Sequence, residues 1–318
     1  MDKKTISVCI PVYNEAENLP RAVEAVEALF REDLKDYALE LIVTDNASTD
    51  DTWRIVHFLA QSRPHMHGYR LSRNFGYQNS VFAGLSLAHG DAVVELDADL
   101  EDPPHVIARF VERWREGYDV VYGVRVTRHT PRLLRLLFAG FYRVLSRISE
   151  FPIPEDTGDF RLLDRKVVDV LKSLPERNLY LRGLVSFVGF KQAAVSYDRQ
   201  PRLSGRSKFR LMQYVVLAID AITAFSKTPL RLVGMLGALL FVASMLLAIY
   251  YAVRRIVAGT VVPGFTTLVI LMLLLHSVTF IFLGILGEYL SRIFDDSKKR
   301  PRVVIAEATE SKDFLKVL

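Results

Sequence analysis

The chain has 318 residues, half of them hydrophobic, and a formal net charge of +5. This length accommodates about two domains. Its one cysteine, Cys9, excludes an internal disulfide. The N-terminal apolar stretch is short and is broken by Asn14 and Glu15, which excludes a signal peptide, so we expect the N-terminal part to remain in the cytosol.

Short apolar runs rich in β-branched residues alternate with segments of helical periodicity in the first part of the chain. In chain order, the sequence predicts strands at 5–13, 39–45, 69–76, 91–99 and 118–126, with helices at 15–34, 49–62, 76–90 and 104–117. Strands that alternate with helices indicate an α/β domain with a mainly parallel sheet. In such sheets, ligands bind beyond the carboxyl ends of the strands.

A basic amphipathic segment follows near 131–149. At helical spacing, Arg132, Arg135, Arg143 and Arg147 gather on one side, while leucine and phenylalanine side chains fill the other. This pattern is typical of a helix in the lipid interface, and an ordinary surface helix docked on the core is the alternative. We expect a second interface helix at 208–225.

Two long stretches, 232–253 and 265–287, contain no charged residue. Each is long enough to cross about 30 Å of hydrocarbon as a helix. The short connection between them predicts a transmembrane hairpin. Basic residues are frequent before the first span and after the second, which places both termini in the cytoplasm.

These features divide the chain into a cytosolic α/β domain at 1–225, a transmembrane hairpin at 226–292 and a cytosolic tail at 293–318. The expected location is the inner cell membrane, as a multi-pass protein. The two spans leave surface for packing between chains, so we expect a homo-oligomer. Since the basic residues cluster around the spans and the amphipathic segment, nucleic-acid binding is excluded.

The strand predicted at 91–99 ends in a concentration of negative charge, "VVELDADLEDPP". If the strand continues through it, Asp97 and Asp99 point to the same face, which Glu95 shares. Neighbouring carboxylates repel each other, and a divalent cation relieves that repulsion while it binds substrate phosphates. The pattern predicts a metal–diphosphate site, with surface acids in a loop as the alternative. Asp102 is a candidate cap for the helix that opens at Pro103–Pro104, and Glu101 has no settled role.

The end of the strand at 39–45 also carries polar groups, "TDNASTDDT". Asp45 is placed to accept a hydrogen bond from a nucleobase N–H or a ribose hydroxyl. Ser48, Thr49 or Asp50 is a candidate N-cap of the following helix. Both roles are compatible.

Six segments in order resemble the motifs of one family: "SVCIPVYNEAENL", "DNASTDDT", "LSRNFGYQNSVFAGLSLAHGDAVVELDADLEDPP", "DTGDFRLLDRKVVDVL", "LPERN" and "GRSKF". The chain resembles glycosyltransferase family 2, and within it the polyprenyl-phosphate glycosyltransferases, such as bactoprenol-phosphate glucosyltransferases and dolichol-phosphate mannose synthase. The resemblance covers nearly the whole chain, including the two apolar stretches.

The resemblance implies a GT-A fold that binds a nucleotide sugar. By its motifs, Pro11, Tyr13, Glu15 and Asp45 line the nucleotide pocket. Asp97 and Asp99 fall on the Asp-x-Asp motif, which holds Mg²⁺ or Mn²⁺ and the donor diphosphate. Arg206 and Lys208, in "SGRSKF", resemble a basic loop that meets phosphate near the membrane, and anchoring of the first span is their alternative role.

The resemblance assigns Asp159, in "DTGDF", as a catalytic base beside the sugar. A phosphate monoester acceptor is largely dianionic near neutral pH and has little need of a base. Orientation of the sugar, or stabilisation of positive charge at its anomeric carbon, is the alternative role for Asp159.

Two positions depart from the family pattern. The usual Asp-Asp-Gly-Ser reads Asp45-Asn46-Ala47-Ser48 here, which loses one acid and a glycine. The usual glutamine after "DADL" is Glu101, which adds negative charge near the diphosphate.

The resemblance therefore implies a metal-dependent, inverting hexosyltransferase. We expect transfer of glucose from UDP-glucose to undecaprenyl phosphate at the cytoplasmic membrane face, for cell-envelope glycosylation. A processive polysaccharide synthase is an alternative, although its Gln-x-x-Arg-Trp motif does not occur around Trp53 or Trp114. A non-catalytic membrane scaffold or lipid transporter is another, although its Asp-x-Asp would be expected to degenerate.

Overall fold

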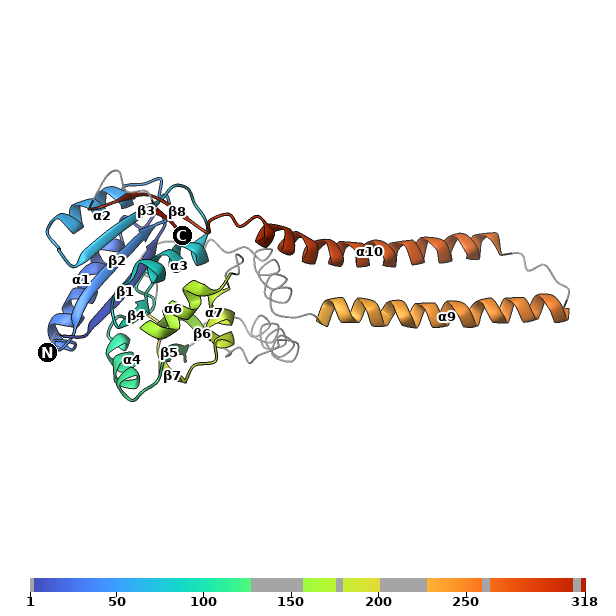
Figure 1. Cartoon of the computed structure of the whole chain (residues 1–318), viewed down its shortest axis with the longest axis horizontal. Coiled ribbons are helices and arrows are strands. Elements are labelled where there is room, and N and C mark those ends of the chain that lie inside the picture. Colours follow the sequence, from blue (N-terminus) through green and yellow to red (C-terminus); the bar gives the residue numbers. More distant parts are fainter. Residues whose placement is uncertain (1–2, 127–156, 176–179, 201–227, 259–263, 311–315) are drawn as a thin grey trace. The chain divides into compact units, whose positions relative to one another are not determined.

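A computed structural model describes all residues except 1–2, 127–156, 176–179, 201–227, 259–263 and 311–315 (Figure 1). Both segments expected at the lipid interface lie outside the described residues, as do Arg206 and Lys208. The described residues form two compact units, one from residues up to 200 and from 300 onward, the other from 228–299.

The first unit contains β1 (Thr5–Val12), α1 (Leu19–Glu32), β2 (Ala38–Asp45), α2 (Thr52–Gln61), β3 (Met66–Leu71), α3 (Tyr77–Leu87), β4 (Ala92–Glu95), α4 (Val106–Arg115), β5 (Val120–Arg125), β6 (Thr157–Asp164), α6 (Arg165–Ser173), α7 (Leu181–Phe187), β7 (Gln192–Tyr197), β8 (Val304–Ala308) and β9 (Lys316–Val317). The predicted alternation of strands and helices is confirmed from β1 to β5. Several boundaries differ: β3 runs from Met66 to Leu71, and β4 already ends at Glu95.

The sheet is mixed, which corrects the prediction of a mainly parallel sheet. Its order is β7-β5-β6-β4-β1-β2-β3-β8-β9. β1, β2, β3 and β4 form a parallel centre, and β5 pairs in parallel with β7. β6 lies antiparallel between β4 and β5, and β8 lies antiparallel beside β3. The sequence could not predict these two insertions, because both strands come from distant parts of the chain.

Helices cover both faces of the parallel centre. Alternate side chains of β1, including Ile6, Val8 and Ile10, are fully buried in an apolar cluster with α1, α2 and α4. Cys9 faces the other side, where a Cβ on Gly84 of α3 would come within 3.1 Å of the Cys9 Cβ. The period-two alternation of β1 therefore makes a three-layer α/β unit, since each face meets its own helices.

The predicted cytosolic tail contributes a strand to the sheet. β8 pairs with β3, and Val303, Ile305 and Ala308 are buried (Figure 1). The chain thus returns to the first unit after α10. Pairing with β8 also covers the edge of β3, which would otherwise present unpaired N–H and C=O groups.

The second unit contains α9 (Thr228–Ala258) and α10 (Phe265–Ser297), which contact each other. Among the described residues, one segment, Leu275–Ser297, is long and apolar enough to cross a membrane by length and composition. Leu232–Leu247 is a shorter apolar helix. The predicted hairpin of two spans therefore stays a prediction.

Replacing Ile305 with alanine tests whether β8 is an integral part of the sheet. Ile305 is fully buried, so its truncation is expected to lower the free energy of unfolding by about 2–4 kcal/mol. The measurement is thermal unfolding followed by tryptophan fluorescence, because both tryptophans, Trp53 and Trp114, lie in the first unit. Val317→Ala on exposed β9 is the matched control, and an equal loss in both variants would contradict the assignment.

Candidate active site

The predicted site residues that the structure describes come from segments that end or begin at one edge of the sheet. This edge carries the carboxyl ends of β1, β2 and β4 and the amino end of antiparallel β6. The loop after β1 is tied to the loop after β2, because the Asn14 N–H donates to the Ser48 hydroxyl at 2.9 Å and the Thr49 N–H donates to Asn14 Oδ1 at 2.8 Å. The structure thereby brings together strand ends that lie far apart in the sequence.

Pro11 determines where the acidic segment leaves the sheet. The Leu96 N–H donates to the Cys9 carbonyl at 3.0 Å, and the next bond of this parallel ladder would come from the N–H of residue 11. Proline has no N–H, so the ladder between β1 and β4 stops there. Asp97 and Asp99 therefore follow a strand that has already ended, which corrects the premise that they continue its alternation. Leu100, with φ of 55°, turns the backbone further.

Tyr13 and Glu15, the residues after β1 that are predicted to line the nucleotide pocket, differ from each other in their surroundings. Tyr13 is partly exposed, with 39% of its surface accessible. Glu15 accepts a hydrogen bond from the Asn18 side chain at 2.7 Å, and its N–H donates to the Thr52 hydroxyl at 2.9 Å. Glu15 thus joins the start of α1 to the start of α2.

Asp45 is a fully buried carboxylate at the end of β2. Its Oδ1 accepts from the Ser48 N–H at 3.1 Å, and Arg70 Nε lies 3.2 Å from its Oδ2. The angle to Arg70 does not make a hydrogen bond, so Oδ2 is a buried acceptor with no donor in the described chain. Burial raises the pKa of Asp45, against the Ser48 hydrogen bonds and the Arg70 charge, which lower it.

The structure shows the environment of both residues that depart from the family motif after Asp45, namely Asn46 and Ala47. The Asn46 side chain donates to Asn74 Oδ1 at 3.1 Å and accepts from the Phe75 N–H at 2.9 Å, which an aspartate could not do in both directions. Ala47 has φ of 59°, a left-handed conformation that favours the family's glycine. Of the candidate caps, Asp50 accepts from the Thr52 N–H at 3.0 Å, while the N-cap position itself is Asp51.

Asp97 lies in an unfavourable charge environment. Its Oδ1 accepts a hydrogen bond from the Tyr77 hydroxyl at 2.7 Å. Burial, followed by the charges of Asp99 and Asp159, raises its pKa to about 7, although the Tyr77 hydrogen bond lowers it. Asp99 Oδ1 accepts from the Glu101 N–H at 3.1 Å. Asp97 has no cationic partner among the described residues.

Asp159 lies near Asp97. Glu95, the last residue of β4, pairs with Arg161 of β6, and the charge of Asp159, two residues before Arg161, raises the pKa of Asp97. Arg182 binds Asp159 through two hydrogen bonds, Nε to Oδ1 at 2.7 Å and Nη2 to Oδ2 at 2.8 Å. Burial raises the pKa of Asp159, but Arg182 and Arg161 outweigh it and hold that pKa below its ordinary value. A carboxylate held in this way is a weak proton acceptor.

Glu95 lies behind these acids and is only 2% exposed. The Tyr77 hydroxyl lies 3.4 Å from Glu95 Oε1, and Arg161 Nε lies 3.9 Å from its Oε2. Burial and the neighbouring charge of Asp159 raise the pKa of Glu95 well above its ordinary value.

Two acids beyond the Asp-x-Asp have roles that the sequence did not show. Asp102 does not cap α4, whose N-cap is His105, but accepts from the Tyr197 hydroxyl at 2.6 Å and from Arg125 Nη2 at 2.9 Å. Glu101 forms an ion pair with Arg199. The extra negative charge of Glu101 is therefore compensated by the positive charge of Arg199.

Sequence reasoning missed the groups that hold these acids, namely Tyr77, Arg161, Arg182 and Arg199. Each partner comes from another element, and nothing in its local sequence distinguishes it. No group of three or more histidine, cysteine, aspartate or glutamate side chains in the described chain forms a metal cluster. The candidate metal ligands are thus the pair Asp97 and Asp99, and Mg²⁺ commonly binds one or two carboxylates together with substrate phosphates.

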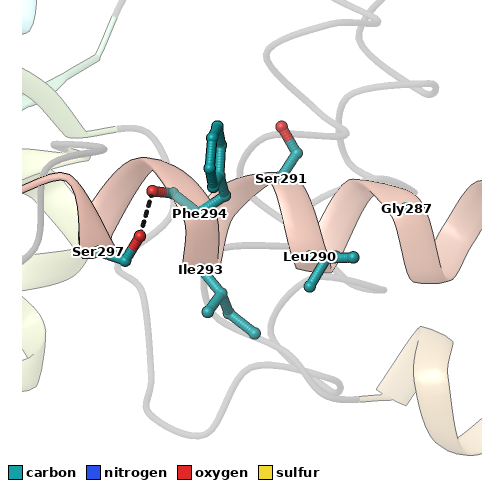
Figure 2. A pocket seen from close by; sticks show the side chains of 6 residues that line it. All are labelled: Gly287, Leu290, Ser291, Ile293, Phe294 and Ser297. Carbon is teal, nitrogen blue, oxygen red and sulfur yellow. Dashed lines mark hydrogen bonds between the residues drawn. The ribbon is translucent and has the colours of Figure 1, made fainter.

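A separate pocket on α10 lacks this chemistry. It is lined by Gly287, Leu290, Ser291, Ile293, Phe294 and Ser297 (Figure 2). The Ser297 hydroxyl donates to the Phe294 carbonyl at 2.7 Å, as Figure 2 shows. The lining carries no charged group that would bind a metal or a phosphate.

The mixed sheet with helices on both faces and an acidic edge is a GT-A-like glycosyltransferase fold. The family model of glycosyl transferase family 2 matches residues 7–171, from β1 into α6. The chain belongs to glycosyltransferase family 2, as its motifs indicated.

Similar proteins span the whole chain. It is 41% identical over 303 residues to the bactoprenol glucosyl transferase of Shigella phage SfX, covering 94% of this chain and 98% of that protein. It is 38% identical over 303 residues to the uncharacterized glycosyltransferase YkcC of Bacillus subtilis, covering 95% and 93%. Among solved structures, a mannosyltransferase of Pyrobaculum calidifontis with GDP-Man and Mn²⁺ aligns with a TM-score of 0.47 and 20% identity, over 65% of this chain and 59% of that one.

Ala47→Gly is expected to stabilise the protein by about 0.5–1 kcal/mol, because glycine adopts a positive φ without steric cost. The midpoint of thermal unfolding measures this change. Ala25→Gly within α1 is the matched control and is expected to destabilise by about 1 kcal/mol. A loss of stability in Ala47→Gly would rule out strain at this position.

Arg182→Met is expected to lower the free energy of unfolding by about 1–3 kcal/mol, because it leaves Asp159 beside other acids without its main cation. Asp159→Asn in the same chain removes the uncompensated charge and is expected to recover part of the loss. Thermal unfolding of both single variants and the double variant measures the coupling. Additive losses would show that the two residues do not stabilise each other.

Proposed function

We propose that the protein transfers glucose from a nucleotide sugar, UDP-glucose in the first instance, to a polyprenyl phosphate carrier. The observation that carries the proposal is the charge environment of Asp97. Asp102, Asp159 and Glu101 each pair with an arginine, whereas Asp97 has no cationic partner in the described chain. Such a carboxylate beside Asp99 fits a site for a divalent cation with its diphosphate ligand.

The class of acceptor follows from the relatives. Several proteins similar over nearly the whole chain are named bactoprenol glucosyl transferase. Their similarity includes α9 and α10 as well as the catalytic fold, since it covers 94% or more of this chain. We therefore assign undecaprenyl phosphate as the acceptor and cell-envelope glycosylation as the purpose.

In this mechanism the donor diphosphate lies at the carboxyl edge of the sheet. Asp97 and Asp99 would hold Mg²⁺ or Mn²⁺ there, and the bound ion would neutralise the diphosphate as it leaves. Pro11, Tyr13, Glu15 and Asp45 would surround the nucleoside, with Asp45 Oδ2 free to accept from the base or the ribose.

The acceptor phosphate attacks the anomeric carbon from the face opposite the leaving group. A bond forms between an oxygen of the acceptor phosphate and the anomeric carbon. The bond between the anomeric carbon and the diphosphate oxygen breaks, and the configuration at that carbon inverts. The dianionic acceptor needs no proton removed, so Asp159 need not act as a base. Its pairing with Arg182 instead favours a role in orienting the sugar and opposing positive charge at the anomeric carbon.

The lipid acceptor requires the active site to lie at a membrane surface. We propose that α9 and α10 form a transmembrane hairpin at 226–292, because both expose large apolar side chains along their length, among them Leu232, Met235, Phe241, Phe280 and Ile281. The excess of basic residues beside the helix ends favours cytoplasmic termini and a cytoplasmic catalytic domain at 1–225 in the inner membrane. Within this scheme, interface helices near 131–149 and 208–225 would rest on the lipid, and Arg206 and Lys208 would contact phosphate.

Two further points belong to the proposal. Two spans leave surface for packing against other copies of the chain, so the proposal includes a homo-oligomer in the membrane. The segment at 293–318 is assigned to the catalytic domain, because β8 is part of its sheet.

Asp97→Asn and Asp99→Asn are each expected to lower the transfer rate by about 100-fold or more, because they remove the carboxylates that would hold the cation that neutralises the diphosphate. The assay follows labelled sugar from a panel of nucleotide sugars into undecaprenyl phosphate with Mg²⁺, using the full chain in detergent. Glu112→Gln, an exposed acid of α4, is the control and is expected to retain full activity.

The same assay separates the alternatives. Absence of lipid-linked label with every donor would reject the proposal and favour a scaffold. Label in long polymers would favour a processive synthase. Full activity of either aspartate variant would reject the metal role of that residue.

A further inference from the structure

The C-terminal segment contacts the predicted nucleotide pocket through the sheet. In the antiparallel pair of β3 and β8, Glu307 lies directly opposite Arg70, and the register shifts between Arg70 and Leu71. Ile305 and Ala308 are buried on either side of Glu307. Because a slip by one residue would expose these side chains, the buried neighbours fix the position of Glu307.

Glu307 uses both oxygens of its carboxylate within the first unit. Oε1 accepts from Arg70 Nη1 at 3.3 Å, and Oε2 accepts from Trp53 Nε1 at 3.0 Å. The Arg70 guanidinium also lies over the Trp53 ring, 5.9 Å from its centroid. Glu307 and Trp53 together limit the directions in which Arg70 can point.

Arg70 also contacts the residues at the end of β2. Its Nε lies 3.2 Å from Asp45 Oδ2, and its Nη2 donates to the Ser48 carbonyl at 3.2 Å. The guanidinium therefore lies between two carboxylates, Asp45 with no exposed surface and Glu307 with 41% of its side chain exposed. If Arg70 turned to solvent, the buried Asp45 carboxylate would lose the positive charge beside it.

We propose that Glu307 is a positioning residue for the nucleotide donor: through Arg70 it fixes the orientation of the Asp45 carboxylate, which accepts from the base or ribose. This inference rests on the proposed role of Asp45 in nucleotide binding. It makes the segment that follows α10 a working part of the donor site, although Glu307 and Arg70 are separated by 237 positions in the sequence.

Glu307→Gln tests the proposal, because glutamine keeps the size of the side chain and an oxygen for Trp53 but removes the charge from Arg70. The expected result is an increase in the KM for the nucleotide sugar of about two- to fivefold, the range for a partly exposed ion pair. The kcat and the KM for the lipid acceptor are expected to stay unchanged. Equal changes in all three parameters would indicate a general structural defect and overturn the proposal.

Glu310→Gln is the matched control. Glu310 comes just after β8 and, like Glu307, pairs with a β3 side chain, His67, but no contact links this pair to Asp45. Its donor KM is expected to match that of the unaltered protein. A rise equal to that of Glu307→Gln would show that any loss of charge in the segment has the same effect, which would overturn the specific role of Glu307.

A double variant gives a readout that a purely structural role would not affect. Glu307 and Asp45 are connected through Arg70, so Glu307→Gln is expected to have little further effect on nucleotide affinity once Asp45 is replaced by asparagine. Titration calorimetry of the full chain with UDP and with GDP measures this affinity without the acceptor. Independent effects of the two substitutions would overturn the proposal.

Calorimetry also separates this inference from the proposed function. Nucleotide binding with coupled variants, but without transfer to polyprenyl phosphate, would support the positioning role and reject the acceptor. Transfer with uncoupled variants would support the function and reject the positioning role. If neither nucleotide bound the unaltered protein, both would be rejected.

Discussion

The repulsion among carboxylates at one edge of the sheet is the constraint on which the site depends. The acids come from the end of β2, the segment after β4 and the start of β6, and burial makes their charges costly. Most of these acids form ion pairs with arginines from four separate parts of the chain: Arg70, Arg125, Arg182 and Arg199. Asp97 has no cationic partner among the described residues, and this imbalance is the reason we propose a ligand site at this edge.

The backbone determines where the segment that carries Asp97 leaves the sheet. Pro11 ends the ladder between β1 and β4, so the acidic segment separates from the sheet directly after Leu96. Tyr77, at the start of α3, then holds Asp97 by its hydroxyl. A residue expected to line the nucleotide pocket thus also has a structural role, since the missing N–H of proline releases the segment that carries Asp97.

The topology joins two distant parts of the chain beside the predicted nucleotide pocket. After β7 the chain leaves the sheet, and it returns only at β8, beside β3. Glu307 thereby reaches Arg70, and Arg70 reaches Asp45. The segment after α10 consequently cannot be treated as a dispensable tail, because it supplies buried apolar side chains and a charge to the catalytic fold.

The sequence by itself determined the α/β alternation from β1 to β5 and the family, and it indicated the acids of the candidate site, because period-two and helical patterns and the order of motifs are local properties of the chain. It did not determine that β6 and β8 enter the sheet antiparallel, that β4 ends at Glu95, or which arginine answers which acid. Those were decided by the tertiary structure, because strand pairing and ion pairing join residues far apart in the sequence. The partners of Asp159 and Asp45 illustrate the reason: an arginine's position in the chain does not indicate which carboxylate it will meet.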